Sequence, residues 1–305
     1  MTPADLALVF PGQGSQKVGM GQGLLVHPQA AEVFARAERV LGWPVARLCV
    51  EGPEEQLNDT AYTQPALLTV SVAALRALEG RLERPAFVAG HSLGEFSALV
   101  AAGALDFEDA LQLVRERGRL MKEAGEQQPG GMAAVLGLEA PQVEEICERV
   151  RTETGGFVGI ANDNCPGQVV ISGDERALQA TAEPLRAAGA RRVLRLAVSI
   201  AAHSPLMRRA ATTFRAVLAR VTFRPPQVPV VSNRAAAPLT NPEAIRQAIG
   251  QQLTSPVRWR ESVRWMIDRG VHRFVEIGPG DVLTGLLRRI EPAVEGLTTE
   301  QVLGS

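Results

Sequence analysis

A serine flanked by glycines, at a predicted turn from strand to helix, is the feature of this sequence most able to do chemistry. Gly90-His91-Ser92-Leu93-Gly94 follows the apolar run 86–89 and precedes the helix-like run 95–102. Such a turn needs small residues two positions either side of the serine, and it exposes the hydroxyl above the sheet. The backbone N–H of Leu93 would then face a developing oxyanion. We therefore predict a nucleophilic serine; the alternative is a glycine-rich turn whose serine only caps the next helix.

A serine of ordinary pKa needs a base within hydrogen-bond reach, and imidazole is the natural choice. Of the four histidines, His91 lies inside the turn and points away from its neighbour's hydroxyl, whereas His27 and His272 lie in a polar loop and at a strand start. His203 precedes Ser204-Pro205, a pair typical of a helix N-cap and first helical position. A lone histidine is more often structural, but beside a serine turn we favour His203 as the general base.

The segment Pro11 to Gln16 follows the first predicted strand and contains two glycines. Its Gly-x-Gly pattern is incomplete and no Gly-Lys-Ser/Thr follows, which argues against a phosphate loop. We interpret it as a tight loop beside the serine turn, in which the backbone N–H of Gln13 is a second oxyanion donor. A plain turn at the end of a strand is an equally good interpretation of these residues alone. The location fits, since open α/β sheets bind ligands at the carboxyl ends of their strands.

Arg117 gives a clue to the substrate, because it falls in the middle of the apolar face of the predicted helix 106–121. An arginine turned inward must find an anion, either a structural carboxylate or the carboxylate or phosphate of a ligand. Both readings are open from the helix alone. With a serine nucleophile nearby, an acyl group that carries a free carboxylate becomes the attractive candidate.

Composition excludes several classes of protein. The 305 residues are 46% hydrophobic with a formal net charge of -1, so no bulk field attracts nucleic acid or an anionic membrane. Aromatic residues make up 4% of the chain, which leaves little for base stacking. Three cysteines, Cys49, Cys147 and Cys165, lack disulfide or metal spacing and indicate reduced thiols in a cytoplasm, and we expect no metal site, leader peptide or membrane span.

The elements that must position these residues alternate between short apolar runs and amphipathic helical patterns, as in a parallel α/β sheet covered by helices. A glycine-rich joint at 127–131 begins a compact βαββαβ set, the ferredoxin-like unit. We therefore expect a small inserted domain at 129–199 within a larger domain formed by 1–128 and 200–305. Strands are predicted at 6–10, 87–89, 132–136, 157–161, 168–172, 192–198, 228–232 and 273–277, and helices at 30–41, 64–78, 95–102, 106–121, 141–151, 175–188, 205–220, 242–253 and 257–269.

Motifs along nearly the whole chain resemble the malonyl-CoA:acyl carrier protein transacylases of fatty-acid synthesis. The resemblance implies an α/β-hydrolase-like large domain with a ferredoxin-like insert, no cofactor, and malonyl-CoA and acyl carrier protein as partners. It implies Ser92 as nucleophile and His203 as base, oriented by the backbone carbonyl of Gln252. The motifs that carry it are Phe10 to Gln16, Gln64 to Leu67, Gly90 to Glu95, Arg117-Gly118, Gly167 to Gly173, His203-Ser204, Ser255 to Val257 and Glu276 to Gly280.

The same resemblance implies Gln13 and Leu93 as the oxyanion hole, Arg117 as the carboxylate clamp and Asn162 as a polar residue of the cleft. Arg288-Arg289 matches a basic pair of the family, a candidate docking site for an acidic carrier; two solvated helix residues are the alternative.

The sequence departs from the family pattern beside the base and leaves rival functions open. Ala201-Ala202 stands where a bulkier pair is usual, so we expect room for acyl groups larger than malonyl. An acyltransferase or acyl hydrolase of a polyketide synthase, or a non-catalytic carrier-binding subunit, would also fit the chain.

Overall fold

The larger of two sheets carries the predicted serine turn at the end of one of its central strands. A computed structural model describes residues 5–304, and in it this sheet has the order β11-β10-β1-β2-β7-β8. Neighbouring strands of this sheet are parallel, as expected for an α/β fold, except that β7 and β8 are antiparallel. Its strands are β1 (Leu6–Phe10), β2 (Phe87–Gly90), β7 (Val230–Val231), β8 (Pro238–Leu239), β10 (Arg273–Glu276) and β11 (Glu295–Thr298).

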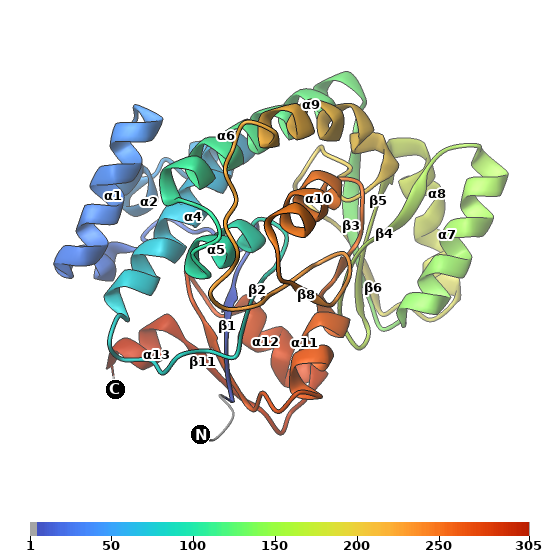
Figure 1. The fold of residues 1–305 in the computed structure, drawn as a ribbon. Coiled ribbons are helices and arrows are strands. Elements are labelled where there is room, and N and C mark those ends of the chain that lie inside the picture. Colours follow the sequence, from blue (N-terminus) through green and yellow to red (C-terminus); the bar gives the residue numbers. More distant parts are fainter. Residues whose placement is uncertain (1–4, 305) are drawn as a thin grey trace.

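Helices cover both faces of this sheet (Figure 1). Alternate residues of β1 belong to different cores, with Leu6, Leu8 and Phe10 in the larger cluster and Ala7 and Val9 in a second one, because side chains alternate across a strand. The larger cluster is formed with α1 (Pro28–Leu41), α2 (Val45–Glu51), α3 (Glu54–Asn58), α4 (Thr60–Ala77), α5 (Gly94–Ala101), α6 (Phe107–Gln127), α9 (Arg208–Leu218) and α10 (Pro242–Gln252). The second is formed with α11 (Trp259–Ile267) and α12 (Val282–Ile290).

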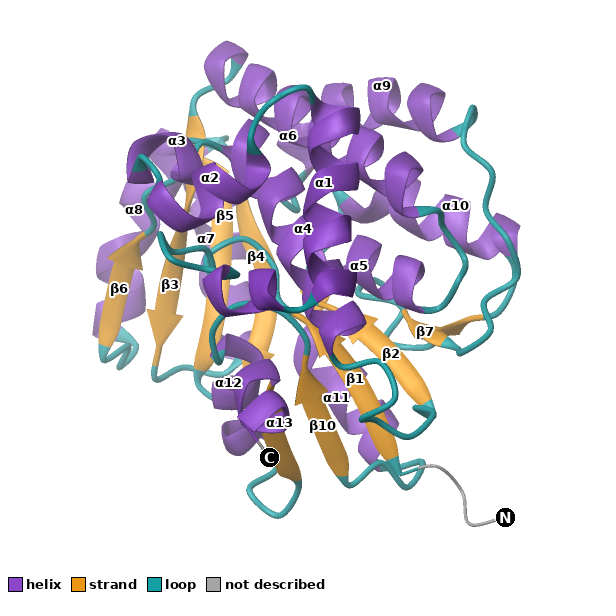
Figure 2. Cartoon of the chain, turned by 90° about the vertical axis from the view of Figure 1, so that its left-hand side faces the viewer, coloured by secondary structure: helices purple, strands orange, loops and turns teal. Residues whose placement is uncertain are grey.

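The second sheet lies beside the first and has the order β6-β3-β5-β4-β9 (Figure 2). Its antiparallel strands are β3 (Gly130–Leu136), β4 (Val158–Cys165), β5 (Gln168–Asp174) and β6 (Arg192–Arg195). Helices α7 (Ala140–Thr154) and α8 (Glu175–Ala187) pack on one face and close a third core. The fifth strand, β9 (Val257–Arg258), comes from much later in the chain and pairs with β4 in parallel.

Several predicted elements differ from the structure. The helix predicted at 257–269 begins as β9 and becomes helical only at Trp259, and the strand predicted at 192–198 ends at Arg195. The helix predicted at 205–220 is divided into the 3-10 turn η2 (Pro205–Met207) and α9, and the strand predicted at 228–232 is only Val230–Val231. The prediction omitted η1 (Gln22–Val26), α2, α3, β8, α12, β11 and α13 (Thr299–Gly304), all of them short.

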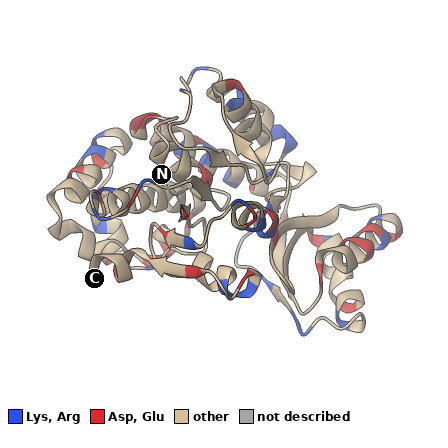
Figure 3. Ribbon diagram, turned by 60° about the horizontal axis from the view of Figure 1, so that its bottom comes forward, with Lys and Arg blue, Asp and Glu red and all other residues tan. Residues whose placement is uncertain are grey.

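Basic and acidic residues are interspersed along the helices and loops of the fold (Figure 3). Within residues 5–304 no helix has the length and apolar character needed to cross a membrane.

Candidate active site

Ser92 lies in a strained turn at the carboxyl end of β2. Its φ of 50° is in the left-handed region, which residues other than glycine rarely adopt. Two glycines allow the chain to turn this sharply: a Cβ on Gly90 would meet backbone atoms of Gly94 at 1.9 Å, and one on Gly94 would meet the carbonyl oxygen of Phe10 at 2.0 Å. The spacing that predicted a serine turn therefore corresponds to close backbone contacts on both sides.

The loop after β1 packs directly against this turn. A Cβ on Gly12 would approach the carbonyl oxygen of His91 to 2.3 Å, so only glycine fits there. Gln13 and Leu93 both line the cavity in front of Ser92, and the backbone N–H of neither residue donates to an acceptor within residues 5–304. Two free donors beside a nucleophile are what an oxyanion hole requires.

His203 contacts Ser92 across 111 positions of sequence. Its Nε2 lies 2.8 Å from Ser92 Oγ, and its Nδ1 lies 3.0 Å from the carbonyl oxygen of Gln252 and 3.1 Å from that of Ser255. Because both carbonyls only accept, Nδ1 carries the proton and Nε2 is left to accept from the serine. Burial, and then the charge of Arg117, lowers the pKa of His203 to about 3. The imidazole is therefore neutral at physiological pH.

Arg117 extends from α6 into the same site and is 1% exposed. It donates to Gln64 Oε1 and Gln252 Oε1, each at 2.9 Å, and to Ser92 Oγ at 3.1 Å, while its Nε has no partner among the described residues. No carboxylate of residues 5–304 lies within ion-pair distance of it. Burial lowers the pKa of Arg117 to about 10, so the group stays cationic at pH 7. A direct ion pair is therefore absent within residues 5–304, although the charge of Glu95 acts on Arg117 from beyond that distance. The role of Arg117 as a clamp for a ligand carboxylate stays a prediction.

A buried carboxylate, Glu95, lies behind these groups and is 1% exposed. It accepts from Gln252 Nε2 at 2.5 Å and from the backbone N–H of Asn233 at 3.2 Å. Gln252 Nε2 also donates to the carbonyl oxygen of Ser92 at 3.0 Å. Burial raises the pKa of Glu95 to about 7. Gln252 therefore contacts the base, the arginine and the serine, which is more than the carbonyl contact expected of it.

A cavity of about 470 Å³ opens in front of Ser92, His203 and Arg117. Asn162, on β4, is buried and lines it, as the sequence predicted, and Ala202 lines it next to the base. Apolar walls come from the second sheet, from the segment after β6 and from α12, with Met132, Val170, Leu196, Val198, Leu283 and Leu286. A cavity of this size that combines apolar walls with polar and charged side chains is typical of a ligand site.

The two candidate docking residues lie on α12, whose first turn borders the cavity. Arg289 is exposed but donates to Gln168 Oε1 at 2.5 Å and to the carbonyl oxygen of Pro166 at 2.7 Å, which ties α12 to the β4–β5 turn. Arg288 is exposed and has no partner among the described residues. The pair is therefore not equivalent, and Arg288 is the freer group.

The sequence analysis gave no role to three buried residues of the site, Gln64, Glu95 and Asn233. Gln64 and Glu95 stand inside recognised motifs, but their contacts reach α6 and α10 and could not be inferred from spacing. Asn233 carries no local signal. His91 was correctly set aside as base, since its Nε2 lies 2.8 Å from Asn164 Oδ1.

Comparisons with known proteins agree with this geometry. The family model described as the acyl transferase domain matches residues 7–305. The chain is 47% identical to the malonyl CoA-acyl carrier protein transacylase of Escherichia coli (strain K12), over 94% of this chain and 93% of that protein. Two solved structures superpose with a TM-score of 0.93 at 44% identity, each over 97% of this chain and 96% of the other. They are an acyl carrier protein S-malonyltransferase from Vibrio cholerae and a malonyl-transacylase in complex with a type II polyketide acyl carrier protein.

Proposed function

This chain belongs to the acyl transferase domain family, and from that premise we propose that it transfers the malonyl group of malonyl-CoA to the phosphopantetheine thiol of acyl carrier protein through a malonyl ester on Ser92. The product supplies chain elongation in fatty-acid synthesis. The observation that carries the chemistry is the contact of Ser92 Oγ with both a neutral imidazole and a buried guanidinium without an acid partner.

In the first half-reaction His203 Nε2 takes the proton of Ser92 as Oγ attacks the thioester carbon of malonyl-CoA. The carbonyl oxygen becomes an oxyanion that accepts from the N–H groups of Gln13 and Leu93, each worth on the order of 3 kcal/mol. When the tetrahedral intermediate collapses, the C–S bond breaks and the imidazolium returns its proton to the CoA sulfur. The thiol leaves and Ser92 is malonylated.

The second half-reaction runs the same steps with the carrier's thiol as nucleophile. His203 removes the thiol proton, the sulfur attacks the ester carbon, and the proton passes to Ser92 Oγ as the ester breaks. One base and one oxyanion hole thus serve both directions, and the scheme calls for no metal or redox cofactor. The carbonyls of Gln252 and Ser255, at 3.0 and 3.1 Å, support the imidazole in the place of the usual acid.

Arg117 is the proposed clamp for the malonyl carboxylate. Its Nη2 is 3.1 Å from the oxygen that would carry the acyl group, so a carboxylate one methylene beyond the ester carbonyl lies within its reach. Guanidinium binds carboxylate through parallel N–H donors, and in a buried site such a pair gains strength. Asn162 is a further polar neighbour of the acyl chain in this proposal.

The fold proposal has two parts. The order β6-β3-β5-β4 with α7 and α8 on one face supports a ferredoxin-like small domain at 129–199. The serine turn between β2 and α5 supports an α/β-hydrolase-like large domain at 1–128 and 200–305.

Carrier docking at α12, mainly through Arg288, and a cytoplasmic location belong to the same proposal. Three buried free cysteines fit a reducing compartment.

The direct test of this function is transfer to a carrier protein. Purified protein, malonyl-CoA and holo carrier protein are mixed, and the mass of the carrier is followed. We expect a malonyl increment on the holo form and none on the apo form, which lacks the thiol. Release of free malonate in place of carrier loading would identify an acyl hydrolase, and no turnover of malonyl-CoA would identify a non-catalytic carrier-binding subunit.

A further inference from the structure

The backbone of the serine turn is held by one side chain from a different part of the chain. Asn233 Oδ1 accepts from the backbone N–H of Ser92 at 2.6 Å, and Asn233 Nδ2 donates to the carbonyl oxygen of Gly90 at 2.5 Å. The side chain is 1% exposed and lies 141 positions from Ser92 in sequence. The opposite orientation of its amide would place oxygen against oxygen and N–H against N–H, so both contacts fix the amide and the turn together.

These two hydrogen bonds matter because Ser92 is strained. A left-handed backbone at a residue other than glycine costs on the order of 1 kcal/mol or more and persists only when its surroundings impose it. Asn233 joins the two residues that flank His91, and it follows β7, which pairs with β2 on the edge opposite β1. No other side chain within residues 5–304 makes hydrogen bonds to both Gly90 and Ser92.

Asn233 also determines which backbone N–H group of the turn stays free to bind the substrate. Ser92 and Leu93 offer consecutive N–H groups at the turn. Asn233 occupies the first, whereas the second has no acceptor among the described residues. An occupied Ser92 N–H cannot rotate toward the cavity, so Leu93 is the donor that remains for an oxyanion.

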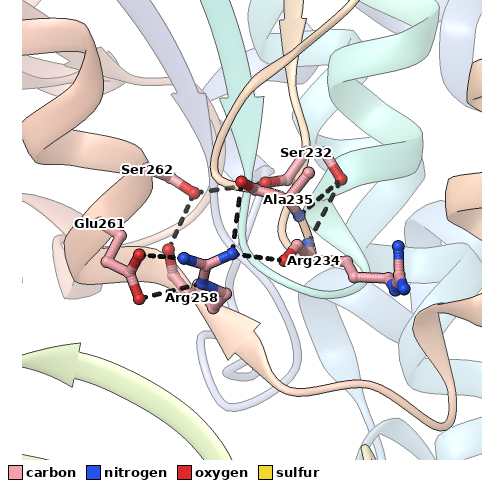
Figure 4. Close-up of polar contacts among 6 residues, drawn as sticks. All are labelled: Ser232, Arg234, Ala235, Arg258, Glu261 and Ser262. Carbon is pink, nitrogen blue, oxygen red and sulfur yellow. Dashed lines mark hydrogen bonds and ion pairs between the residues drawn. The ribbon is translucent and has the colours of Figure 1, made fainter.

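The turn that carries Asn233 is itself held by hydrogen bonds from Arg258, as Figure 4 shows for its neighbours Arg234 and Ala235. The guanidinium of Arg258 donates to the carbonyl oxygens of Arg234 at 3.2 Å and Ala235 at 3.4 Å while paired with Glu261, and the backbone N–H of Arg258 donates to the carbonyl oxygen of Asn233 at 2.8 Å. Within the turn, Ser232 Oγ accepts from the N–H groups of Arg234 and Ala235.

Arg258 belongs to β9, which pairs with β4 of the second sheet. The second sheet, the turn at 232–237 and the nucleophile therefore form one continuous hydrogen-bonded chain. Glu95 adds a further contact by accepting from the N–H of Asn233.

We propose that Asn233 is a positioning residue for the nucleophile: its amide holds Gly90 and Ser92 in the strained turn, keeps Leu93 as the free donor, and is itself held by Arg258. The inference rests on the proposed acyl transfer at Ser92. It concerns the reactivity of the serine and not recognition of the malonyl carboxylate. A change at Asn233 should therefore slow acylation by malonyl and acetyl groups equally.

The test is Asn233→Ala, measured in single-turnover malonylation and acetylation of the enzyme. Loss of two buried hydrogen bonds to the turn should lower the rate constant of acylation by about 10- to 100-fold. Both acyl groups should lose the same factor, and the KM for each CoA ester should stay within about twofold. Labelling of Ser92 by a fluorophosphonate should slow in parallel, because this reagent needs the nucleophile and the oxyanion hole but no carboxylate clamp.

Two further variants keep the outcome interpretable. Arg258→Ala leaves the Asn233 side chain intact but loosens its turn, and it should show the same pattern at about two- to tenfold. Thr181→Val removes a buried hydrogen bond to the carbonyl oxygen of Ala177 in α8. Thr181 does not line the cavity, so the change should lower the melting temperature without changing the acylation rate.

Wild-type acylation rates in a folded Asn233→Ala protein would overturn the inference, and so would a selective loss of malonyl over acetyl. If Asn233→Ala does not fold, an unchanged rate constant in Arg258→Ala overturns it instead. Failure of the wild-type protein to become malonylated would refute the proposed function itself, which is a separate result.

Discussion

Removing the guanidinium of Arg117 should slow malonyl transfer far more than acetyl transfer. The side chain is 1% exposed, has no acid partner within residues 5–304 and donates to the oxygen of Ser92. A malonyl ester on Ser92 would place its carboxylate beside this cation, whereas an acetyl ester would leave the cation unpaired. Arg117→Ala therefore removes a favourable contact for the malonyl group, and it removes an unpaired buried cation beside the acetyl group.

The size of the effect follows from the burial of the pair. Truncating one partner of a desolvated, hydrogen-bonded charge pair costs about 2 to 5 kcal/mol. At the lower bound this is a loss of roughly 30-fold in kcat/KM for malonyl-CoA. Acetyl transfer should be unchanged or faster, so the ratio of the two should shift by at least the same factor.

The assay compares single-turnover acylation by the two CoA esters at one pH and salt concentration. Arg119→Ala is the matched control, because Arg119 stands two residues further along α6 but is exposed and paired with Glu116 and Glu123. It should leave the ratio unchanged. Equal losses for both substrates in Arg117→Ala, together with a lower melting temperature, would show that Arg117 supports the fold and that carboxylate selectivity lies elsewhere.

Further tests concern His203, Ala202 and Arg288. Burial, with the charge of Arg117, lowers the pKa of His203 from 6.5 to about 3, so the unfolded chain binds the extra proton as pH falls through this range. The free energy of unfolding of wild type should therefore fall relative to His203→Ala between pH 6.5 and 4 in urea titrations, and a constant difference would contradict the lowered pKa. Ala202 borders the cavity, so wild type should be acylated by methylmalonyl-CoA and Ala202→Phe should lose most of this reaction; rejection by wild type would show that another side chain fills the space. Arg288→Glu should raise the KM for an acidic carrier and reduce its salt dependence without slowing acylation by malonyl-CoA, and equal loss in both half-reactions would point to damage to the fold.

Residues with a local signature could be predicted from the sequence, and those defined by tertiary contacts could not. The glycines around Ser92, the Ser-Pro pair after His203 and the place of Arg117 on an apolar helix face each reflect a local constraint. Asn233 shows none, because its function depends on a turn that meets β2 only in the folded sheet.

The same limit applies to secondary structure. Val257 and Arg258 continue a helical pattern in sequence, yet they form β9 because β4 offers a free edge there. The predicted strand ends at Arg195, and the residues after it line the cavity. Leu196 and Val198 are apolar because they form a wall of the cavity, and the sequence pattern alone made them look like part of a strand. The short elements β11 and α13 are too brief for periodicity to reveal.

Peptide mass spectrometry after incubation with malonyl-CoA alone tests the central claim most directly. We expect one malonyl group per chain, on the peptide that contains Ser92, and its removal when holo carrier protein is added. Ser92→Ala should carry none. A malonyl group on another residue, or stoichiometric acylation that persists in Ser92→Ala, would contradict the assignment of Ser92 as the nucleophile.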